Sequence, residues 1–226
     1  MTQSLFITAT DTDAGKTLIA QSILRLANAK GKTTLGYKPI SAGCQQTANG
    51  LRNEDAEILQ QQATLSVAYE QVNPIAFVDP VAPHLAAQKC GETIELSQIQ
   101  RGYQSLFELG ADLLVVEGAG GWRLPLGQGM FLSDFVRDAQ IPVVLVVGLK
   151  LGCLNHALLT YQALLHDGVN VVGWIANQID PDMLYLQSNI DALHDLIGVP
   201  CLGVVPYLKS SQSPDSYINI NMLFED

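Results

Sequence analysis

The amino-acid sequence predicts an α/β fold in which a doubly wound, mostly parallel sheet carries helices on both of its faces. Short apolar runs rich in β-branched residues alternate with longer segments of helical period, as repeated strand–helix–strand units do. These runs are nearly continuous in apolar residues, which is typical of strands that helices cover on both sides. Ligands of such sheets bind outside the carboxyl ends of the strands, so residues just after strands are candidates for a site.

The expected elements follow in a regular order from the N-terminus. Strands are expected at 5–9, 33–37, 113–116, 143–147, 169–176 and 201–205. Helices are expected at 16–29, 54–62, 95–109, 131–139, 154–166 and 183–197, and a Ser-, Gln- and Pro-rich loop at 210–216. Because no internal repeat or linker interrupts this order, we expect a single domain spanning residues 1–226.

Composition excludes several classes of protein. The 226 residues include 12 basic and 22 acidic side chains, a net charge of −10, which argues against a protein that coats nucleic acid. A local cationic pocket for a small phosphate compound stays compatible with that balance. With 48% hydrophobic and 15% charged residues, the chain is not expected to be disordered. The sequence shows neither a secretory signal pattern nor an apolar run of membrane-spanning length, so we expect a cytoplasmic protein without a membrane partner.

The cysteines, histidines and tryptophans are interpreted as structural. Cysteines stand at positions 44, 90, 153 and 201 without any C-x-x-C pair, so we expect buried or partly buried thiols. For His84 and His156, a packed or hydrogen-bonded ring is favoured over a proton carrier. Trp122 and Trp174 are expected to pack in the core.

A phosphate-binding loop is expected between the first strand and the first helix. The segment T-D-T-D-A-G-K-T occupies residues 10–17 and matches the G-x-x-x-x-G-K-[ST] pattern, except that Thr10 replaces the first glycine. Backbone N–H groups would hold phosphate oxygens, Lys16 would reach the β- and γ-phosphates, and the Thr17 hydroxyl could bind Mg²⁺. The alternative is a G-K-T tripeptide that only begins an ordinary helix, which the preceding strand disfavours.

Two further strand ends carry charged residues toward the same edge of the sheet. Glu117 ends the apolar run 113–116 and precedes Gly118, Ala119 and Gly120, so it could supply an oxygen ligand to Mg²⁺ beside a closely approaching backbone. Lys38 follows the second strand and could join Lys16 in binding a nucleotide and an anionic acceptor. The alternatives are a glycine-rich turn beside an exposed carboxylate and a solvated lysine at a strand end.

Taken together, the motifs of the chain resemble those of the dethiobiotin synthetases, and the resemblance spans residues 5–208. The segments that carry it are T-D-T-D-A-G-K-T (10–17), G-Y-K-P (36–39), G-L-R-N-E-D-A (50–56), V-N-P (72–74), A-P-H (82–84), V-E-G-A-G-G-W (116–122), V-V-G-L-K-L-G-C-L-N-H-A (146–157), G-W-I-A-N (173–177) and V-P-Y-L (205–208). The resemblance implies a P-loop NTPase-like fold and an ATP- and Mg²⁺-dependent cyclo-ligase of biotin synthesis. That enzyme would close 7,8-diaminononanoate and CO₂ into dethiobiotin through a carbamate and a carbamic–phosphoric anhydride.

The resemblance also implies roles for individual residues. Catalytic roles would belong to Lys38, Lys16 and Thr12, and Mg²⁺ would be bound by Thr17, Asp55 and Glu117. The substrate would contact Thr12, Lys38, Ser41, Gly118, Gly152 and Asn155. ATP would contact Asp13, Ala14, Gly15, Lys16, Thr17, Leu18, Asp55, Glu117, Gly118, Ala119, Gly120, Asn177, Gln178, Pro206, Tyr207 and Leu208.

Several of these assignments depend on the resemblance alone. From the residues, Asp55 indicates only the acidic start of a capped helix, and Gly152 and Asn155 indicate only a helix start. In the family this last helix start receives the substrate carboxylate across a subunit interface, which implies a homodimer with shared sites. Ser41 departs from the family, which often has its hydroxyl at the position of Ala42, and Gln178 replaces a frequent aspartate.

Two other functions stay open as alternatives. The first is a partition- or division-site ATPase, but the signature lysine of that class would stand where Asp11 stands. The second is a ligase that activates another carboxylate or carbamate acceptor.

Overall fold

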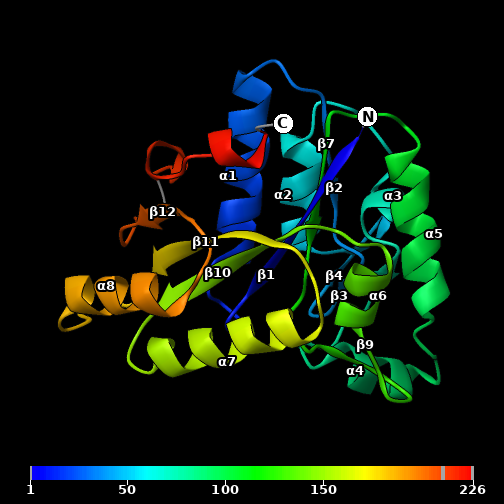
Figure 1. Cartoon of the computed structure of the whole chain (residues 1–226). Helices are drawn as coiled ribbons and strands as arrows, with labels where there is room; N and C mark the ends of the chain where they lie inside the picture. Colours follow the sequence, from blue (N-terminus) through cyan, green and yellow to red (C-terminus); the bar gives the residue numbers. More distant parts are fainter. Residues whose placement is uncertain (1, 210–211, 225–226) are drawn as a thin grey trace.

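A computed structural model describes residues 2–209 and 212–224 of the chain. Its main sheet has the strand order β12-β11-β10-β1-β7-β2, and each neighbouring pair runs parallel. The strands of this sheet are β1 (Gln3–Ala9), β2 (Thr34–Tyr37), β7 (Leu113–Glu117), β10 (Val143–Leu149), β11 (Val171–Gln178) and β12 (Cys201–Val205). Figure 1 shows β1 in the middle of the sheet. The predicted α/β class with a doubly wound parallel sheet is confirmed.

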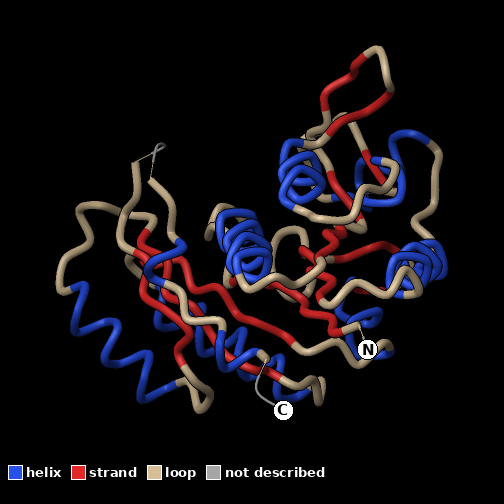
Figure 2. The backbone as a smooth tube through the Cα atoms, turned by 90° about the horizontal axis from the view of Figure 1, so that it is seen from above, coloured by secondary structure: helices blue, strands red, loops and turns tan. Residues whose placement is uncertain are grey.

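Helices connect the strands and cover both faces (Figure 2). The longer ones are α1 (Lys16–Ala29), α2 (Glu54–Gln62), α4 (Pro83–Cys90), α5 (Leu96–Phe107), α6 (Leu132–Asp138), α7 (Cys153–His166) and α8 (Leu186–Leu196). Short elements complete the fold: β3 (Ile40–Ser41), β4 (Gln45–Thr47), β5 (Gly50–Arg52), α3 (Tyr69–Val72), β6 (Ile75–Ala76), β8 (Pro125–Gly127), β9 (Met130–Phe131) and the 3₁₀ turns Asp215–Tyr217 and Asn221–Leu223.

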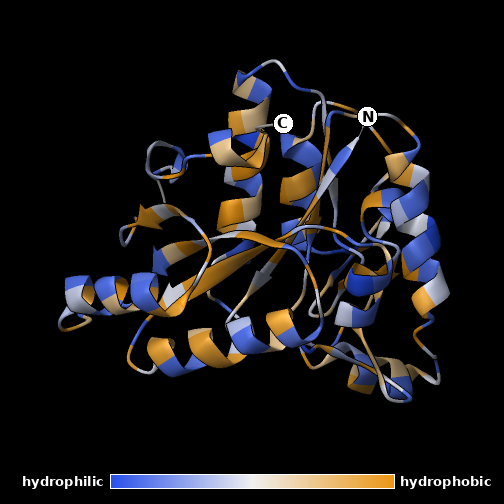
Figure 3. Ribbon diagram, viewed as in Figure 1, coloured by the Kyte–Doolittle hydropathy of each residue, from blue (hydrophilic) through white to orange (hydrophobic). Residues whose placement is uncertain are grey.

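The apolar core lies in two large clusters, and a small third cluster joins Ala56, Tyr69 and Val72. One cluster joins residues of α1 such as Ile19 and Ile23 to strand residues such as Ile7, and it includes Ile218 and Leu223 of the C-terminal segment. The other cluster takes its residues from α5, α6, α7 and α8 together with side chains of the same strands. Because successive side chains of a strand point to opposite faces, β1, β7, β10 and β11 contribute to both clusters. In Figure 3 the central strands are accordingly hydrophobic, whereas the visible face of α8 is largely hydrophilic.

The predicted strands and long helices are present, with shifts at some ends. The predicted strand 169–176 is observed as β11, two residues further on, because Gly148 and Leu149 of β10 pair with Asn177 and Gln178. The predicted helix 183–197 begins only at Leu186, since Tyr185 has a left-handed backbone with φ of 53°. Of the predicted loop 210–216, residues 210 and 211 lie outside the described residues, and a 3₁₀ turn begins at Asp215.

Among residues 2–209 and 212–224, no helix combines the length and the apolar character that crossing a bilayer requires.

The expected buried or partly buried thiols are found at three positions, since Cys44 and Cys153 are buried and Cys201 is partly buried. The expectation is wrong for Cys90, which is exposed because it ends α4 at the surface. Trp122 and Trp174 pack in the core as expected.

Candidate active site

The loop between β1 and α1 is held in the shape that a phosphate-binding loop needs. Asp13 and Gly15 have left-handed backbones, with φ of 60° and 96°. A Cβ atom on Gly15 would also clash with the Nδ2 atom of Asn177, so glycine is required there for both reasons. The Lys16 ammonium donates to the Asp11 carbonyl over 3.3 Å, and its side chain is largely buried. The amides that begin α1 therefore face the carboxyl edge of the sheet, where an anion would be bound.

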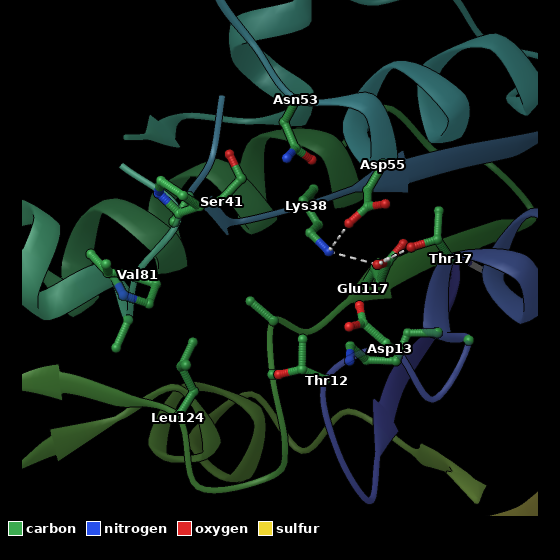
Figure 4. A pocket seen from close by; sticks show the side chains of 18 residues that line it. Thr12, Asp13, Thr17, Lys38, Ser41, Asn53, Asp55, Val81, Glu117 and Leu124 are labelled. Carbon is green, nitrogen blue, oxygen red and sulfur yellow. Dashed lines mark hydrogen bonds and ion pairs between the residues drawn. The ribbon is translucent and has the colours of Figure 1, made fainter. Parts of the chain in front are cut away.

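Lys38 is the centre of a buried ionic cluster (Figure 4). Its Nζ atom lies 2.6 Å from Glu117 Oε1, 3.0 Å from Asp55 Oδ2 and 3.2 Å from the Gly118 carbonyl. The Thr17 hydroxyl donates to the same Glu117 oxygen over 2.8 Å. The side chain of Glu117 is 0% exposed and that of Lys38 is 4% exposed. Residues from α1, β7, α2 and the end of β2 thus meet within hydrogen-bond distance.

Burial and mutual attraction set the charges of this cluster. Burial acts to lower the pKa of Lys38, but the negative charges of Glu117 and Asp55 outweigh it and raise that pKa. Burial raises the pKa of Glu117, against the opposing effect of Lys38. For Asp55, burial is outweighed by the charge and hydrogen bond of Lys38, so its pKa is lowered. Burial, followed by the positive charge of Lys38, lowers the pKa of Lys16.

Asp55 reaches the cluster because α2 begins beside it. The Asn53 side chain accepts from the backbone N–H of Ala56 over 3.3 Å and so caps the helix. Glu54, Asp55 and Glu57 form an acidic first turn, a distribution that the helix dipole favours. The prediction that this segment is the acidic start of a capped helix is therefore confirmed. The helix start also places Asp55 within hydrogen-bond distance of Lys38.

A cavity of about 720 Å³ opens in front of these residues. The predicted site residues that line it are Thr12, Asp13, Gly15, Lys16, Thr17, Lys38, Ser41, Asp55, Glu117, Ala119 and Gly120. One side of the cavity is apolar, and sequence reasoning assigned no role to its residues. That side is formed by Pro80, Val81, Ala82, Pro83 and Leu124. In Figure 4, Val81 and Leu124 lie apart from the Lys38 cluster.

Other predicted site residues lie beside the cavity without lining it. Asn177 donates to the Ala14 carbonyl over 2.9 Å, beneath the phosphate loop. Gln178 accepts from the backbone N–H of Tyr207, so Tyr207 is joined to the strand residue that follows Asn177. Gly152 and Asn155 are exposed at the start of α7 and lie outside the cavity lining of the single chain. Ser41, in contrast, is among the residues that line the cavity, but it is 2% exposed and its hydroxyl donates inward to Asn73 rather than into the cavity.

Comparisons with known proteins identify the family. The "AAA domain" family model matches residues 3–215. The chain is 49% identical over 215 residues to the ATP-dependent dethiobiotin synthetase BioD of Aeromonas salmonicida, covering 95% of both chains. It is 47% identical over 225 residues to the protein of the same name from Cellvibrio japonicus, covering 99% of this chain and 98% of that one. The chain belongs to the ATP-dependent dethiobiotin synthetase family.

Membership of the dethiobiotin synthetase family confirms the resemblance drawn from the motifs, and with it the expectation of an ATP-dependent ligase. Solved structures agree on the fold alone. A ParA family ATPase from Chlorobium tepidum superposes with a TM-score of 0.57 at 14% identity, over 92% of this chain and 85% of that one. The septum site-determining protein MinD of Pyrococcus horikoshii, complexed with Mg-ADP, superposes with a TM-score of 0.53 at 17% identity, over 91% and 82%. These neighbours confirm the P-loop NTPase-like fold.

Proposed function

We propose that this chain converts 7,8-diaminononanoate, CO₂ and ATP into dethiobiotin, ADP and phosphate, as a step of biotin biosynthesis. The observation that carries the proposal is the buried Lys38, held between Glu117 and Asp55 and next to the phosphate loop. Such a fixed ammonium at a strand end can stabilise negative charge that develops on a reacting oxygen. A cavity of about 720 Å³ has room for a nucleotide phosphate and a small acceptor together.

The reaction has three bond-forming steps. One substrate amine attacks the carbon of CO₂, a C=O electron pair moves to oxygen, and loss of a proton leaves a carbamate. A carbamate oxygen attacks the γ-phosphorus, and the bond from that phosphorus to ADP breaks. The second amine then attacks the carbamoyl carbon, the C–O bond to phosphate breaks, and loss of a proton leaves a cyclic urea. Little of this chemistry requires a covalent protein intermediate, so positioning and charge neutralisation are the tasks of the protein.

The proposed roles follow the positions of the side chains. Lys16, at the start of α1, binds the β- and γ-phosphates, and the backbone from Asp13 to Gly15 cradles them. Lys38 stabilises the carbamate and the transferring phosphoryl group. Thr12, exposed at the mouth of the cavity, and the backbone near Gly118 orient the diamine. The apolar side of the cavity, with Val81 and Leu124, would contact the hydrocarbon chain of the substrate.

The residues present fit a magnesium ion. Glu117 Oε2 is buried and has no hydrogen-bond partner among the described residues, which leaves an oxygen available to a cation. Thr17 and Asp55 supply further oxygen atoms near it, and a hard cation prefers such ligands, completed by phosphate oxygens and water. When bound, Mg²⁺ would neutralise charge on the β- and γ-phosphates.

The adenine site and the subunit interface are part of the proposal. The base would contact Asn177, Gln178, Pro206, Tyr207 and Leu208, since Asn177 is hydrogen-bonded to Ala14 of the phosphate loop and Gln178 to Tyr207. Gly152 and Asn155 would bind the substrate carboxylate of a second subunit, and their exposure at the N-terminus of α7 supports this. The cytoplasmic location and the single domain over residues 1–226 also stay predictions.

Phosphate release tests the activity. Purified protein would be incubated with Mg²⁺-ATP and bicarbonate, with and without 7,8-diaminononanoate, and the product identified by mass. We expect release that requires both the diamine and CO₂, together with dethiobiotin. Hydrolysis independent of the diamine, or release with a different acceptor only, would contradict the proposal in favour of a switch ATPase or another ligase.

Mixed dimers test the shared site. The Lys38→Met and Asn155→Ala variants are each expected to be inactive alone. They would be purified separately, mixed, unfolded together and refolded. In a twofold dimer, half of the random assemblies are hybrids with one intact site, so activity should recover to about a quarter of the wild-type value. Mixed dimers verified by mass that remain inactive would exclude a site shared between subunits.

A further inference from the structure

Asn73 lies directly behind Lys38, in the segment that follows α3. It is 3% exposed, and both its side-chain nitrogen and its side-chain oxygen form hydrogen bonds. Its Nδ2 group donates to the Lys38 carbonyl over 2.7 Å and to the Ile75 carbonyl over 3.4 Å. Its Oδ1 atom accepts from the Ser41 hydroxyl over 2.7 Å and from the Tyr69 hydroxyl over 3.1 Å. An asparagine amide can form about four hydrogen bonds, so its capacity is used in full.

These bonds fix the backbone of Lys38 on both sides. The Lys38 N–H donates to the Val72 carbonyl over 2.8 Å, and the Lys38 carbonyl accepts from Asn73. β2 has ended at Tyr37, and β3 begins only at Ile40, where it pairs with β6. Between the two strands, the Asn73 side chain therefore takes the place of a ladder hydrogen bond. The Cα atom of Lys38 is held in place, which directs its ammonium toward Glu117 and Asp55.

A second arm of the same network reaches the N-terminus of α2. The Tyr69 hydroxyl donates to Asn73 and accepts from the backbone N–H of Asn53 over 2.7 Å. Asn53 is the N-cap of α2, and Asp55 follows two residues later. The guanidinium of Arg52 lies 4.0 Å from the centroid of the Tyr69 ring and helps to keep the ring in place. Tyr69 thereby connects the helix that carries Asp55 to the asparagine that holds Lys38.

We propose that Asn73 and Tyr69 are positioning residues, which set the separation between the Lys38 ammonium and the Asp55 carboxylate. The inference rests on the proposed roles of Lys38 in phosphoryl transfer and of Asp55 in metal binding. Supporting hydrogen bonds of this kind typically change metal affinity or activity about 10- to 100-fold when they are removed. A small misplacement of a catalytic group is costly because the reacting atoms must be aligned.

Tyr69→Phe tests the arm to α2, since it removes one hydroxyl and keeps the ring. Binding of ATP would be measured by calorimetry with and without Mg²⁺, which requires no turnover. We expect Mg²⁺-ATP to bind about tenfold more weakly than to the wild type, and metal-free ATP to bind equally well. Equal loss with and without Mg²⁺, or no loss, would overturn this arm of the proposal.

Asn73→Asp tests the arm to Lys38. The carboxylate can still accept from Ser41 and Tyr69, but it cannot donate to the Lys38 carbonyl. We expect kcat to fall about tenfold or more at saturating Mg²⁺, with the KM for ATP changed less than about twofold. A wild-type kcat, or a lower melting temperature with unchanged kcat per folded molecule, would overturn it.

Gln98→Ala is the matched control. Gln98 is exposed, and its side chain donates to the Pro74 carbonyl of the same segment. We expect wild-type calorimetry and kcat for this variant, and the same losses as in Tyr69→Phe would overturn the proposal. If wild-type protein released no phosphate in response to the diamine, the proposed function would be wrong. The calorimetric comparison would still test whether Tyr69 positions the start of α2, because it requires no turnover.

Discussion

Lys38 and Glu117 form the closest ion pair of the cavity, with 2.6 Å between Nζ and Oε1 and almost no exposure to solvent. Replacing Lys38 by Met should lower turnover about 10²- to 10³-fold, because charge developing in the transition state loses its partner. The same change leaves Glu117 buried without a counter-charge, which should cost about 3–5 kcal/mol of unfolding free energy. Turnover by phosphate release and urea unfolding would measure both effects.

A double variant separates catalysis from folding in this experiment. Lys38→Met with Glu117→Gln should recover most of the lost stability, since the buried side chain at position 117 is then neutral, while turnover stays low. Lys30→Met, at an exposed lysine, is the control and should behave as the wild type. Recovery of turnover in the double variant would remove Lys38 from the mechanism.

The role of Glu117 as a Mg²⁺ ligand can be tested separately, because its Oε2 atom is buried and has no hydrogen-bond partner among the described residues. Glu117→Gln removes the charge that a metal ion would meet. The Mg²⁺ concentration for half-maximal activity should rise about tenfold or more. Glu54→Gln, one position before Asp55 on the exposed side of α2, should leave the titration unchanged. Identical titrations for Glu117→Gln and the wild type would show that Glu117 is not a ligand.

At the scale of elements, α7 is tied at its C-terminal end to the segment after β7. The Asp167 carboxylate accepts from the Trp122 indole N–H over 2.7 Å and from Arg123 over 2.5 Å. Ala119, Gly120 and Leu124 of the same segment line the cavity, so α7 supports one of its walls.

Asp167→Ala should remove the hydrogen bonds that hold Trp122 and Arg123, whereas Asp167→Asn keeps an acceptor for the indole N–H. We expect Asp167→Ala to shift the Trp122 emission to longer wavelength and to lower stability by about 1 kcal/mol, with a smaller shift for Asp167→Asn. A Trp174→Phe background isolates the signal, because the chain has 2 tryptophans. Asp138→Ala, at an exposed ion pair, is the control. Identical emission from the Ala and Asn variants would contradict a role for the hydrogen bond.

The long elements were predictable because their signals are local. The buried strands are continuous apolar runs and α1 follows a G-K-T start, so sequence period and position agree. Sequence reasoning missed the eight-residue helix α4. It also missed short elements such as α3, β3 and β6, which have two to four residues and depend on contacts such as that of Asn73 with Lys38. Lys38 and Glu117 were both predicted at strand ends, but their pairing depends on the adjacency of β2 and β7. Only the family resemblance pointed to Asp55.

At the scale of the whole molecule, charge is distributed unevenly. The net charge is −10, yet Lys16 and Lys38 lie at the base of the cavity. An acidic protein can therefore attract an anionic nucleotide at one place, because local potential and net charge are independent.

The C-terminal segment adds a second long-range feature: it returns along α1, where Ile218, Ile220 and Leu223 join the core.

The Asp215 carboxylate fastens that segment, accepting from Ser22 over 2.5 Å and from Arg25 over 2.7 and 2.9 Å. Burial acts to raise its pKa, but these hydrogen bonds outweigh burial and lower it in the folded state. Its stabilising effect is therefore complete above the unfolded pKa of about 3.9 and is lost as pH falls through the lower folded value.

Asp215→Asn should reduce the melting temperature at pH 7 by about 2–4 °C, equivalent to about 1 kcal/mol for a partly exposed pair in a chain of this length. The difference between wild type and variant should stay constant from pH 8 to pH 6 and shrink below about pH 4, because only the wild type loses an ion pair there. Melting followed by circular dichroism across this range would measure it, with Asp182→Asn as an exposed control. A difference of equal size at pH 7 and pH 3 would show that the charge of Asp215 does not hold the segment.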